Sequence, residues 1–465
     1  NMRRGFRQIM DLLEDTGDLV RIKREVDPKF EMSAIMKKLE AENKAFIFEN
    51  IKNADMPAVG GLFTSMSRIG LIFNENSSEE FTLDDAGQKV IAAIENPTPT
   101  TEVDTGPIKD IVLTGDQVDL RKLPVPTFFE LDTGPFITAA VGIFRKPEGH
   151  LNVGFYRVLI VDRNHVLINA SGLSDLRKSY DWYRENDKKM SIAMVLGAPP
   201  WLLMAAASKS PDDVSELEVA GSIAGSSLQM VRCEHSDLLV PADAEMVIET
   251  VVDLHEMVSN TMGEFGAQYG TELAPLSEVT AITKRQDAMF YTLMAGRAKE
   301  HNTLGYLTIY GLAKSIEDKI KESIPFVKQV TIHFDTRIGP LMHVVISIAK
   351  ESDDQPEQVI REAFNTNIGF FDLSWMAKRV IIVDEDVDTT NMDDVEWATW
   401  TRIGRAEKIH LFPDFVTWEI DRSALPDKTS VRVGIDATKD MDYVDDLVKP
   451  IIPGIDDIDL KDYLD

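Results

Sequence analysis

The most informative stretch of this sequence is LNVGFYR, residues 151–157. Its apolar and aromatic residues are typical of a β-strand. Side chains alternate between the two faces of a strand, so Val153, Phe155 and Arg157 are expected to share one face. Arg157 then lies among apolar neighbours, where a guanidinium is costly unless a carboxylate or phosphate pairs with it. The pattern leaves two interpretations open, a core ion pair or a functional cation.

The same stretch belongs to a set of motifs spread along the chain. Asn152 to Arg157 differ only at Phe155 from Asn-Val-Gly-Ile-Tyr-Arg, a signature of the UbiD family of reversible decarboxylases. Four other segments resemble motifs of that family, in the same order, at residues 233–249, 283–290, 395–402 and 433–438. Each motif alone is weakly specific, but the ordered set is very specific. The sequence therefore resembles UbiD-type decarboxylases.

The resemblance implies an α/β fold with a central split β-barrel, like that of flavin reductases, between N-terminal and C-terminal α/β units. Alternating helical and strand-like patterns support the outer units, and closely spaced strand-like runs support the barrel. Spacing within residues 287–298 predicts a further helix. We expect an N-terminal α/β domain at 1–105, a barrel binding prenylated FMN at 106–300, a linker helix at 301–324, a C-terminal α/β domain at 325–440 and an acidic tail at 441–465 at a subunit interface.

The resemblance also implies a prenylated flavin mononucleotide whose phosphate is bound through a divalent ion, usually Mn²⁺, and K⁺. Asn152 and Glu216 match metal ligands of the family, although Glu216 is also compatible with a plain surface carboxylate. Asp175 stands where ferulic acid decarboxylases have a histidine ligand, and its oxygens suit a hard cation. The implied metal ligands are Asn152, Asp175 and Glu216. The implied cofactor-binding residues are Asn152, Phe155, Tyr156, Arg157, Ser174, Asp175, Glu216 and Arg432.

The catalytic acid is where this chain departs most from the family. The family motif is Glu-Gly-Pro-(Phe/Tyr)-Gly-(Glu/Asp), whose last acid donates the proton, whereas residues 262–267 are MGEFGA. Because Met262 and Ala267 carry no proton to donate, Glu264 is the predicted donor, with a non-catalytic loop carboxylate as the alternative. Arg157 is expected to bind the substrate carboxylate or to hold the charge of the acid. The rival donors are Tyr269 and Glu272.

Composition limits the classes of partner and site that the chain can have. Its 465 residues carry a net charge of −29, from 49 basic and 78 acidic side chains, which repels nucleic acids and anionic membranes. No apolar run reaches the ~18 residues of a membrane span, and no apolar leader opens the sequence, so we expect a cytoplasmic protein. The single cysteine, Cys233, excludes an internal disulfide and a Cys-based zinc site. Generic nucleotide, phosphate-loop and zinc-protease motifs are absent from the sequence.

Together, the resemblance implies a carboxy-lyase, a reversible non-oxidative decarboxylase of an aromatic, heteroaromatic or α,β-unsaturated acid, with prenylated FMN as electron sink. A flavin prenyltransferase is implied as the supplier of the cofactor, and a homodimer or larger homo-oligomer is expected. Two alternatives stay open. The altered acid motif suggests a subunit of a multi-subunit aromatic carboxylase, and the third possibility is a flavin-binding homologue without decarboxylase activity.

Overall fold

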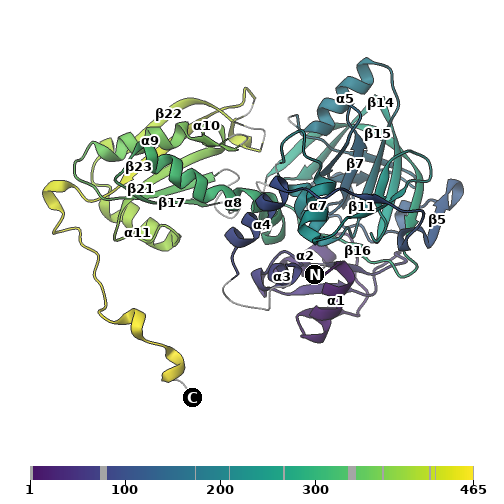
Figure 1. Cartoon of the computed structure of the whole chain (residues 1–465), viewed down its shortest axis with the longest axis horizontal. Coiled ribbons are helices and arrows are strands. Elements are labelled where there is room, and N and C mark those ends of the chain that lie inside the picture. Colours follow the sequence, from purple (N-terminus) through teal and green to yellow (C-terminus); the bar gives the residue numbers. More distant parts are fainter. Residues whose placement is uncertain are drawn as a thin grey trace. The chain divides into compact units, whose positions relative to one another are not determined.

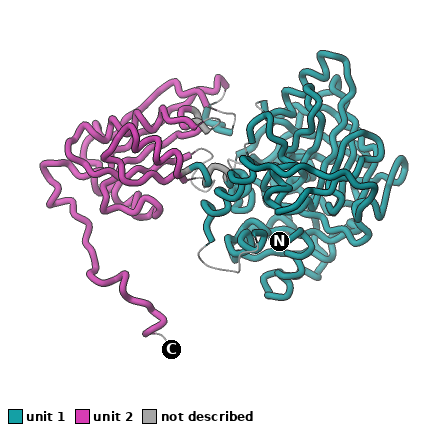
Figure 2. The backbone as a smooth tube through the Cα atoms, in the orientation of Figure 1, with its two compact units in different colours: residues 1–312, 334–341, 418–425 teal, residues 313–333, 342–417, 426–465 magenta. Residues whose placement is uncertain are grey.

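The computed structural model describes residues 4–73, 81–172, 174–208, 210–264, 268–333, 342–368, 371–417, 420–424 and 426–463. The chain forms two compact units (Figure 2), one mainly from residues 4–312 and the other mainly from residues 313–333, 342–417 and 426–463. Within the described ranges, every helix is too short or too polar to span a bilayer.

The first unit opens with a small sheet between helices. Helix α1 buries Phe6, Ile9, Met10 and Leu13 along one stripe, as helical spacing requires. The sheet has the strand order β1-β2-β3-β16. Its elements and their neighbours are α1 (Phe6–Asp15), β1 (Leu19–Ile22), α2 (Glu31–Ala41), β2 (Ala45–Phe48), β3 (Ala58–Gly60), α3 (Met66–Ile72) and α4 (Leu83–Glu95).

Residues 287–298 do not form the predicted helix, so that prediction was wrong. Phe290 and Tyr291 form the short strand β16 (Phe290–Tyr291), which pairs in parallel with β3. Both side chains are almost fully buried, and Gly296 adopts a left-handed backbone with φ +74°. The pairing and burial of two aromatic residues outweigh the local helical spacing.

A nine-stranded curled sheet dominates the first unit (Figure 1). Its main path runs β6-β9-β10-β15-β14-β11-β7-β8, and β5 pairs with β15. The long strands β14 and β15 pair over most of their length. The strands are β5 (Ile111–Thr114), β6 (Phe136–Ile137), β7 (Val141–Arg145), β8 (Leu151–Phe155), β9 (Val158–Ile160), β10 (His165–Ile168), β11 (Met190–Leu196), β14 (Met246–Gly263) and β15 (Tyr269–Lys284).

Three helices and a small sheet lie beside these strands. A three-stranded sheet has the order β13-β12-β4, and α6 and α7 contribute to the same apolar core as β7, β8 and α1. That shared core joins the N-terminal elements to the β-rich region in one unit. The elements are β4 (Thr101–Glu102), α5 (Asp175–Glu185), α6 (Pro200–Ala207), α7 (Glu216–Ala224), β12 (Gln229–Arg232) and β13 (Leu239–Pro241).

The second unit is built on a five-stranded sheet of order β17-β18-β21-β23-β22. The three inner strands β18, β21 and β23 are parallel, and the two outer strands are antiparallel to their neighbours. Helix α8 precedes the sheet, with residues 299–312 belonging to the first unit and residues 313–323 to the second. The elements are α8 (Lys299–Ser323), β17 (Val327–His333), β18 (Met342–Ile348), α9 (Gln355–Asn365), α10 (Leu373–Met376), β21 (Ala377–Asp384), α11 (Met392–Arg402), β22 (Ile409–Val416) and β23 (Thr429–Ala437).

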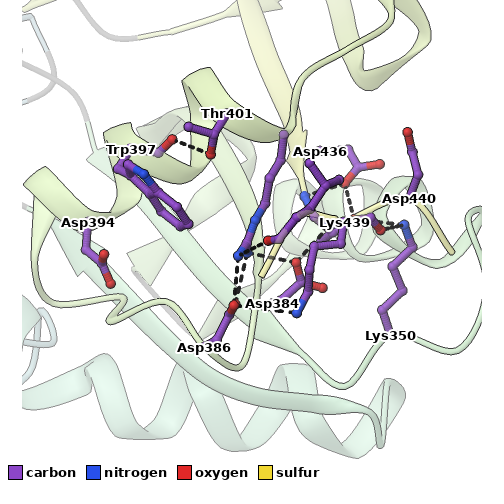
Figure 3. Close-up of polar contacts among 12 residues, drawn as sticks. Lys350, Asp384, Asp386, Asp394, Trp397, Thr401, Asp436, Lys439 and Asp440 are labelled. Atoms are coloured by element: carbon purple, nitrogen blue, oxygen red, sulfur yellow. Dashed lines mark hydrogen bonds and ion pairs between the residues drawn. The ribbon is translucent and has the colours of Figure 1, made fainter. Parts of the chain in front are cut away.

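A buried ionic network closes the carboxyl ends of the parallel strands (Figure 3). Arg402 has a fully buried side chain and pairs with Asp384 at 2.9 Å and Asp386 at 2.7 Å. Lys350 and Lys408, both almost fully buried, donate to the side-chain and carbonyl oxygens of Thr438, respectively. Each of these cations has oxygen acceptors within the network. The network therefore has a structural role in this unit.

Candidate functional site

Two glycines in β7 and β8 make room for the ring of Tyr156. Gly142 and Gly154 pair directly in the antiparallel register of these strands. A Cβ atom would lie 2.7 Å from the Tyr156 ring at Gly142 and 2.8 Å from the Tyr156 hydroxyl at Gly154. Such contacts are too short for any side chain, so the approach of the ring requires glycine at both positions. This packing explains why the residue between Asn152 and Tyr156 in the motif, Gly154, is a glycine.

The strand assignment of Arg157 was wrong, because β8 ends at Phe155. Tyr156 and Arg157 link β8 to β9, and the Arg157 carbonyl accepts a hydrogen bond from the Asn169 N–H at 3.0 Å. The alternation of faces therefore stops before Arg157. Phe155 packs against one apolar core, whereas Tyr156 belongs to the other.

The three predicted metal ligands lie together beside Tyr156. Asn152 is buried in β8, while Asp175 and Glu216 are the first residues of α5 and α7. The Asn152 amide nitrogen donates to Asp175 Oδ2 at 3.2 Å, and its oxygen accepts from the Val153 N–H at 3.0 Å. One amide and two carboxylates form a donor set that suits a hard divalent ion.

The electrostatics of this cluster are unusual for surface carboxylates. Burial raises the pKa of Glu216 to about 7, and the nearby charge of Asp175 adds to the effect. Burial, followed by the charges of Asp175 and Glu216, also raises the pKa of the Tyr156 hydroxyl. Lys146 lies 3.6 Å from Asp175 and supplies a compensating charge. The amino ends of α5 and α7 add partial positive charge at the same place, which favours an anion such as a phosphate.

Among the described residues, no three His, Cys, Asp or Glu side chains converge as a metal centre. The cluster of Asn152, Asp175 and Glu216 has only two members of those types, so its metal-binding role stays a prediction. The side chain of Ser174 caps α5 by accepting from the Arg177 N–H at 3.2 Å. Arg432 lies in the second unit, where its guanidinium stacks on two phenylalanine rings and donates to backbone carbonyls.

Arg157 and Glu264 form an ion pair at the end of β14. The guanidinium donates to Glu264 Oε2 at 2.6 Å and to the Gly263 carbonyl at 3.1 Å. Their side chains are 22% and 14% exposed, so both charges are mostly withdrawn from water. The Glu264 N–H donates to the Gln268 carbonyl at 2.7 Å. The predicted acid and the predicted cation are therefore direct partners.

Asp132 supplies a second carboxylate to this region, which the sequence analysis missed. Its Oδ1 accepts from the Gly263 N–H at 2.9 Å, and its Oδ2 accepts from the N–H groups of Phe128 and Phe129 at 3.2 and 3.0 Å. Burial raises the pKa of Asp132, while these hydrogen bonds and the charge of Arg157 oppose the rise. Asp132 thus fixes the residue immediately before Glu264.

His301, near the start of α8, is a second residue that the sequence analysis missed. Burial lowers the pKa of this histidine to about 3, and the positive charge of Arg157 adds to the effect. The imidazole is therefore neutral at physiological pH. A neutral ring next to the Arg157–Glu264 pair adds a hydrogen-bonding group without adding charge.

The rival donors are placed differently from Glu264. The hydroxyl of Tyr269 accepts a hydrogen bond from the Leu131 N–H at 3.2 Å. Glu272 lies in β15 opposite Asn260, further from the end of the hairpin. Gly270 leaves space for Glu264, since a Cβ there would lie 2.6 Å from the Glu264 side chain. Residues 265–267, including Ala267, lie outside the described residues.

Comparison with known proteins identifies the family of this chain. Three family models match the chain: the 3-octaprenyl-4-hydroxybenzoate carboxy-lyase N-terminal domain at residues 10–84, its Rift-related domain at 100–298 and its C-terminal domain at 308–437. The chain belongs to the UbiD family. The resemblance inferred from the motifs is thereby confirmed.

Solved structures of UbiD-class enzymes match the whole chain. The UbiD-class enzyme HmfF from Pelotomaculum thermopropionicum, in complex with FMN, is 30% identical, with a TM-score of 0.85 over 99% of this chain and 100% of that one. An evolved dimeric form of HmfF, in complex with prFMN, is 29% identical, with a TM-score of 0.80 over 99% and 100%. Vanillic acid decarboxylase from Sedimentibacter hydroxybenzoicus is 25% identical, with a TM-score of 0.80 over 98% of each chain. This chain is therefore an enzyme of the UbiD decarboxylase class, a carboxy-lyase.

Proposed function

We propose that this chain is a reversible, non-oxidative decarboxylase of an aromatic, heteroaromatic or α,β-unsaturated carboxylic acid. We further propose that it uses prenylated FMN, held against the curled sheet in the manner of a split β-barrel. An aromatic acid is favoured by the hydroxybenzoate of the family description and by the vanillic acid of a structural neighbour. The prFMN complex of HmfF supports the cofactor.

The observation that carries the proposal is the Arg157–Glu264 ion pair. A decarboxylase must replace the leaving carboxylate with a proton, so it needs an acid close to the reacting carbon. Glu264 Oε2 lies 2.6 Å from the Arg157 guanidinium, whose planar fork of N–H donors suits bidentate contact with a substrate carboxylate. When neutral carbon dioxide departs, the negative charge of the substrate stays at the reacting carbon, and a protonated Glu264 would deliver its proton there. The Arg157 guanidinium would then pair with the Glu264 carboxylate that results.

The cluster at Asn152 fits the phosphate end of the cofactor. Asn152, Asp175 and Glu216 would hold a divalent ion, proposed as Mn²⁺, with K⁺ nearby, and the amino ends of α5 and α7 would face the phosphate. The flavin supplies the electron sink when it is bound. Phe155, Tyr156, Ser174 and Arg432 keep their predicted cofactor roles as part of this proposal, as does supply by a flavin prenyltransferase in the cytoplasm.

The proton step can be tested with Glu264→Gln after co-expression with a flavin prenyltransferase. We expect loss of carbon dioxide release from a panel of aromatic acids, with flavin absorbance unchanged, because the amide keeps the shape but has no acidic proton. Tyr269→Phe is the matched control and should retain most activity. Product hydrogen exchange in deuterated water reports the proton step directly. Wild-type exchange in Glu264→Gln would place the donor elsewhere.

The metal cluster can be tested separately with Glu216→Gln. We expect metal and flavin to be lost together, because the cluster would lose one of two anionic ligands. Metal analysis and the flavin absorbance of the purified protein measure this without an activity assay. Glu218→Gln, two residues away in the first turn of α7, is the control and should keep both. Full occupancy in Glu216→Gln would remove Glu216 from the site.

A further inference from the structure

Two buried asparagines pair side chain to side chain in the first unit. Asn169 directly follows β10, and Asn260 lies in β14. Asn169 Nδ2 donates to Asn260 Oδ1 at 2.9 Å, and Asn260 Nδ2 donates in return to Asn169 Oδ1 at 2.9 Å. Asn260 Nδ2 also donates to the Glu272 carbonyl at 3.3 Å. Asn169 is 5% exposed and Asn260 is 1% exposed, so each amide satisfies hydrogen bonds of the other that water cannot reach.

The residues around this amide pair are apolar. Leu167 lies two residues before Asn169 and Met262 two residues after Asn260, and both side chains are buried in the same apolar core. Two apolar side chains of suitable volume could fill such a place, and replacing both partners of a buried polar pair in this way is often neutral for stability. Stability alone therefore does not explain the two amides. A buried amide pair does fix one register, because a shift would leave both polar groups unsatisfied.

The amide pair connects two strands that are not neighbours in the sheet. The strand order is β10-β15-β14, so β15 lies between them. On the β10 side, the Asn169 N–H donates to the Arg157 carbonyl at 3.0 Å, which continues the antiparallel ladder of β9 and β10. On the β14 side, Asn260 precedes Gly263, the last residue of the strand, by three residues. The amide pair therefore links the backbone at Arg157 to the end of β14.

The guanidinium of Arg157 returns to the same end of β14. It donates to the Gly263 carbonyl at 3.1 Å and to Glu264 Oε2 at 2.6 Å. The backbone and the guanidinium of Arg157 are thus both tied to β14, the backbone through the amide pair and the guanidinium directly. An arginine side chain has many rotamers, and fixing both of its ends limits the positions that the guanidinium can take.

We infer that Asn169 and Asn260 are positioning residues for Arg157. Their amide pair sets the place of the guanidinium relative to Glu264 and to the substrate carboxylate. The inference rests on the proposed function, in which Arg157 binds that carboxylate. Bidentate contact needs the planar fork of the guanidinium to be aligned with both carboxylate oxygens. Because a displacement of about 1 Å at such a group can cost about 100-fold in rate, loss of the amide pair should be measurable in the kinetics.

A volume-conserving double variant separates positioning from stability. Asn169→Ala alone leaves the buried Asn260 amide with only the Glu272 carbonyl as a partner, so the urea midpoint should fall. Asn169→Ala/Asn260→Leu removes both amides at a similar total volume, so its midpoint should return towards that of the wild type. We expect its kcat/KM for carbon dioxide release to stay at least tenfold below wild type, mainly through KM, because the substrate carboxylate meets Arg157 on binding. Recovery of both the midpoint and kcat/KM would mean that the pair is merely structural.

Thr271→Val is the matched control for these variants. The hydroxyl groups of Thr261 and Thr271 form a hydrogen bond of 2.9 Å between β14 and β15, at an exposed position. Thr261 directly follows Asn260, so this hydroxyl pair lies on the opposite face of the strands from the amide pair. The control removes a polar pair from the same two strands without altering either asparagine. Its urea midpoint and its kcat/KM should both stay close to those of the wild type.

A double-mutant cycle with Arg157 tests the inference without an activity assay. Arg157→Met removes the ion pair with Glu264 and should lower the urea midpoint of the otherwise wild-type chain. If the amide pair places the guanidinium, that ion pair is already weakened in Asn169→Ala, and Arg157→Met should lower the midpoint at most half as much in that background. An effect of equal size in both backgrounds would overturn the inference. A wild-type chain that shows this coupling but decarboxylates no acid would instead refute the proposed function and leave the positioning of Arg157 standing.

Discussion

The contact between Tyr156 and the glycines of β7 and β8 makes a sharp prediction for Gly154→Ala. The new Cβ would lie 2.8 Å from the Tyr156 hydroxyl and 3.0 Å from its Cζ, against about 3.4 Å for ordinary contact. The same edge of the ring lies 2.7 Å from the Cβ position at Gly142, and the ring is buried in an apolar core, so it has little room to move away. Overpacking of this kind costs about 1–3 kcal/mol, and the entropy gained by replacing glycine returns about 0.5–1 kcal/mol.

We therefore expect Gly154→Ala to lower the free energy of unfolding by about 1–2 kcal/mol and to weaken flavin retention. Urea unfolding followed by circular dichroism measures the first effect, and absorbance of the purified protein measures the second. Gly404→Ala is the control, because a Cβ there meets nothing within 4 Å and its backbone needs no positive φ. If Gly154→Ala matches Gly404→Ala in both measurements, the packing argument for the motif glycine is wrong.

Two further predictions concern the residues around the ion pair. Asp132→Asn replaces one hydrogen-bond-accepting oxygen with a donor group, so it should misplace the Gly263 N–H and lower kcat at least tenfold. Carbon dioxide release compares it with the exposed control Glu130→Gln, and equal rates would refute it. The pKa of His301 is lowered from 6.5 to about 3, so as the pH falls this residue takes up a proton in the unfolded chain before it does in the folded chain. The free energy of unfolding therefore decreases below pH 6.5, by up to about 4–5 kcal/mol. His301→Gln should flatten urea midpoints between pH 6.5 and 4 relative to the exposed control His255→Gln, and parallel curves would contradict this.

Sequence patterns predicted the strands and helices whose own residues show a local hydrophobic pattern. The helical stripe of α1 and the apolar strand β21 are local features, so periodicity alone locates them. The helix prediction at residues 287–298 was wrong because a long-range contact decides the structure there. Phe290 and Tyr291 gain from pairing with β3, which lies more than two hundred residues earlier in the chain. A local pattern contains no trace of such a partner.

In the candidate site, too, the sequence pointed to some residues and missed others. The motif pointed to Arg157, and the cost of burying a guanidinium required an acidic partner, which the structure provides in Glu264. Asp132 and His301 had no comparable signal, because neither belongs to a recognisable motif and both approach Arg157 only through folding. Long-range electrostatic neighbours such as these become visible when the chain is folded.

If Glu264 is the proton donor, as we propose, the departure from the family acid motif is a change in the backbone position that carries the catalytic acid. Glu264 occupies the position that the family usually gives to proline, one residue after the end of β14, and Gly270 opens the space into which its side chain turns. Asp132, from a distant loop, holds Gly263 by its N–H and so fixes the start of that turn. Proline at residue 264 would have no N–H to donate to Gln268, whereas glutamate donates at 2.7 Å and closes the loop. On this proposal, the catalytic acid can move along the sequence as long as its side chain reaches Arg157, as Glu264 does at 2.6 Å.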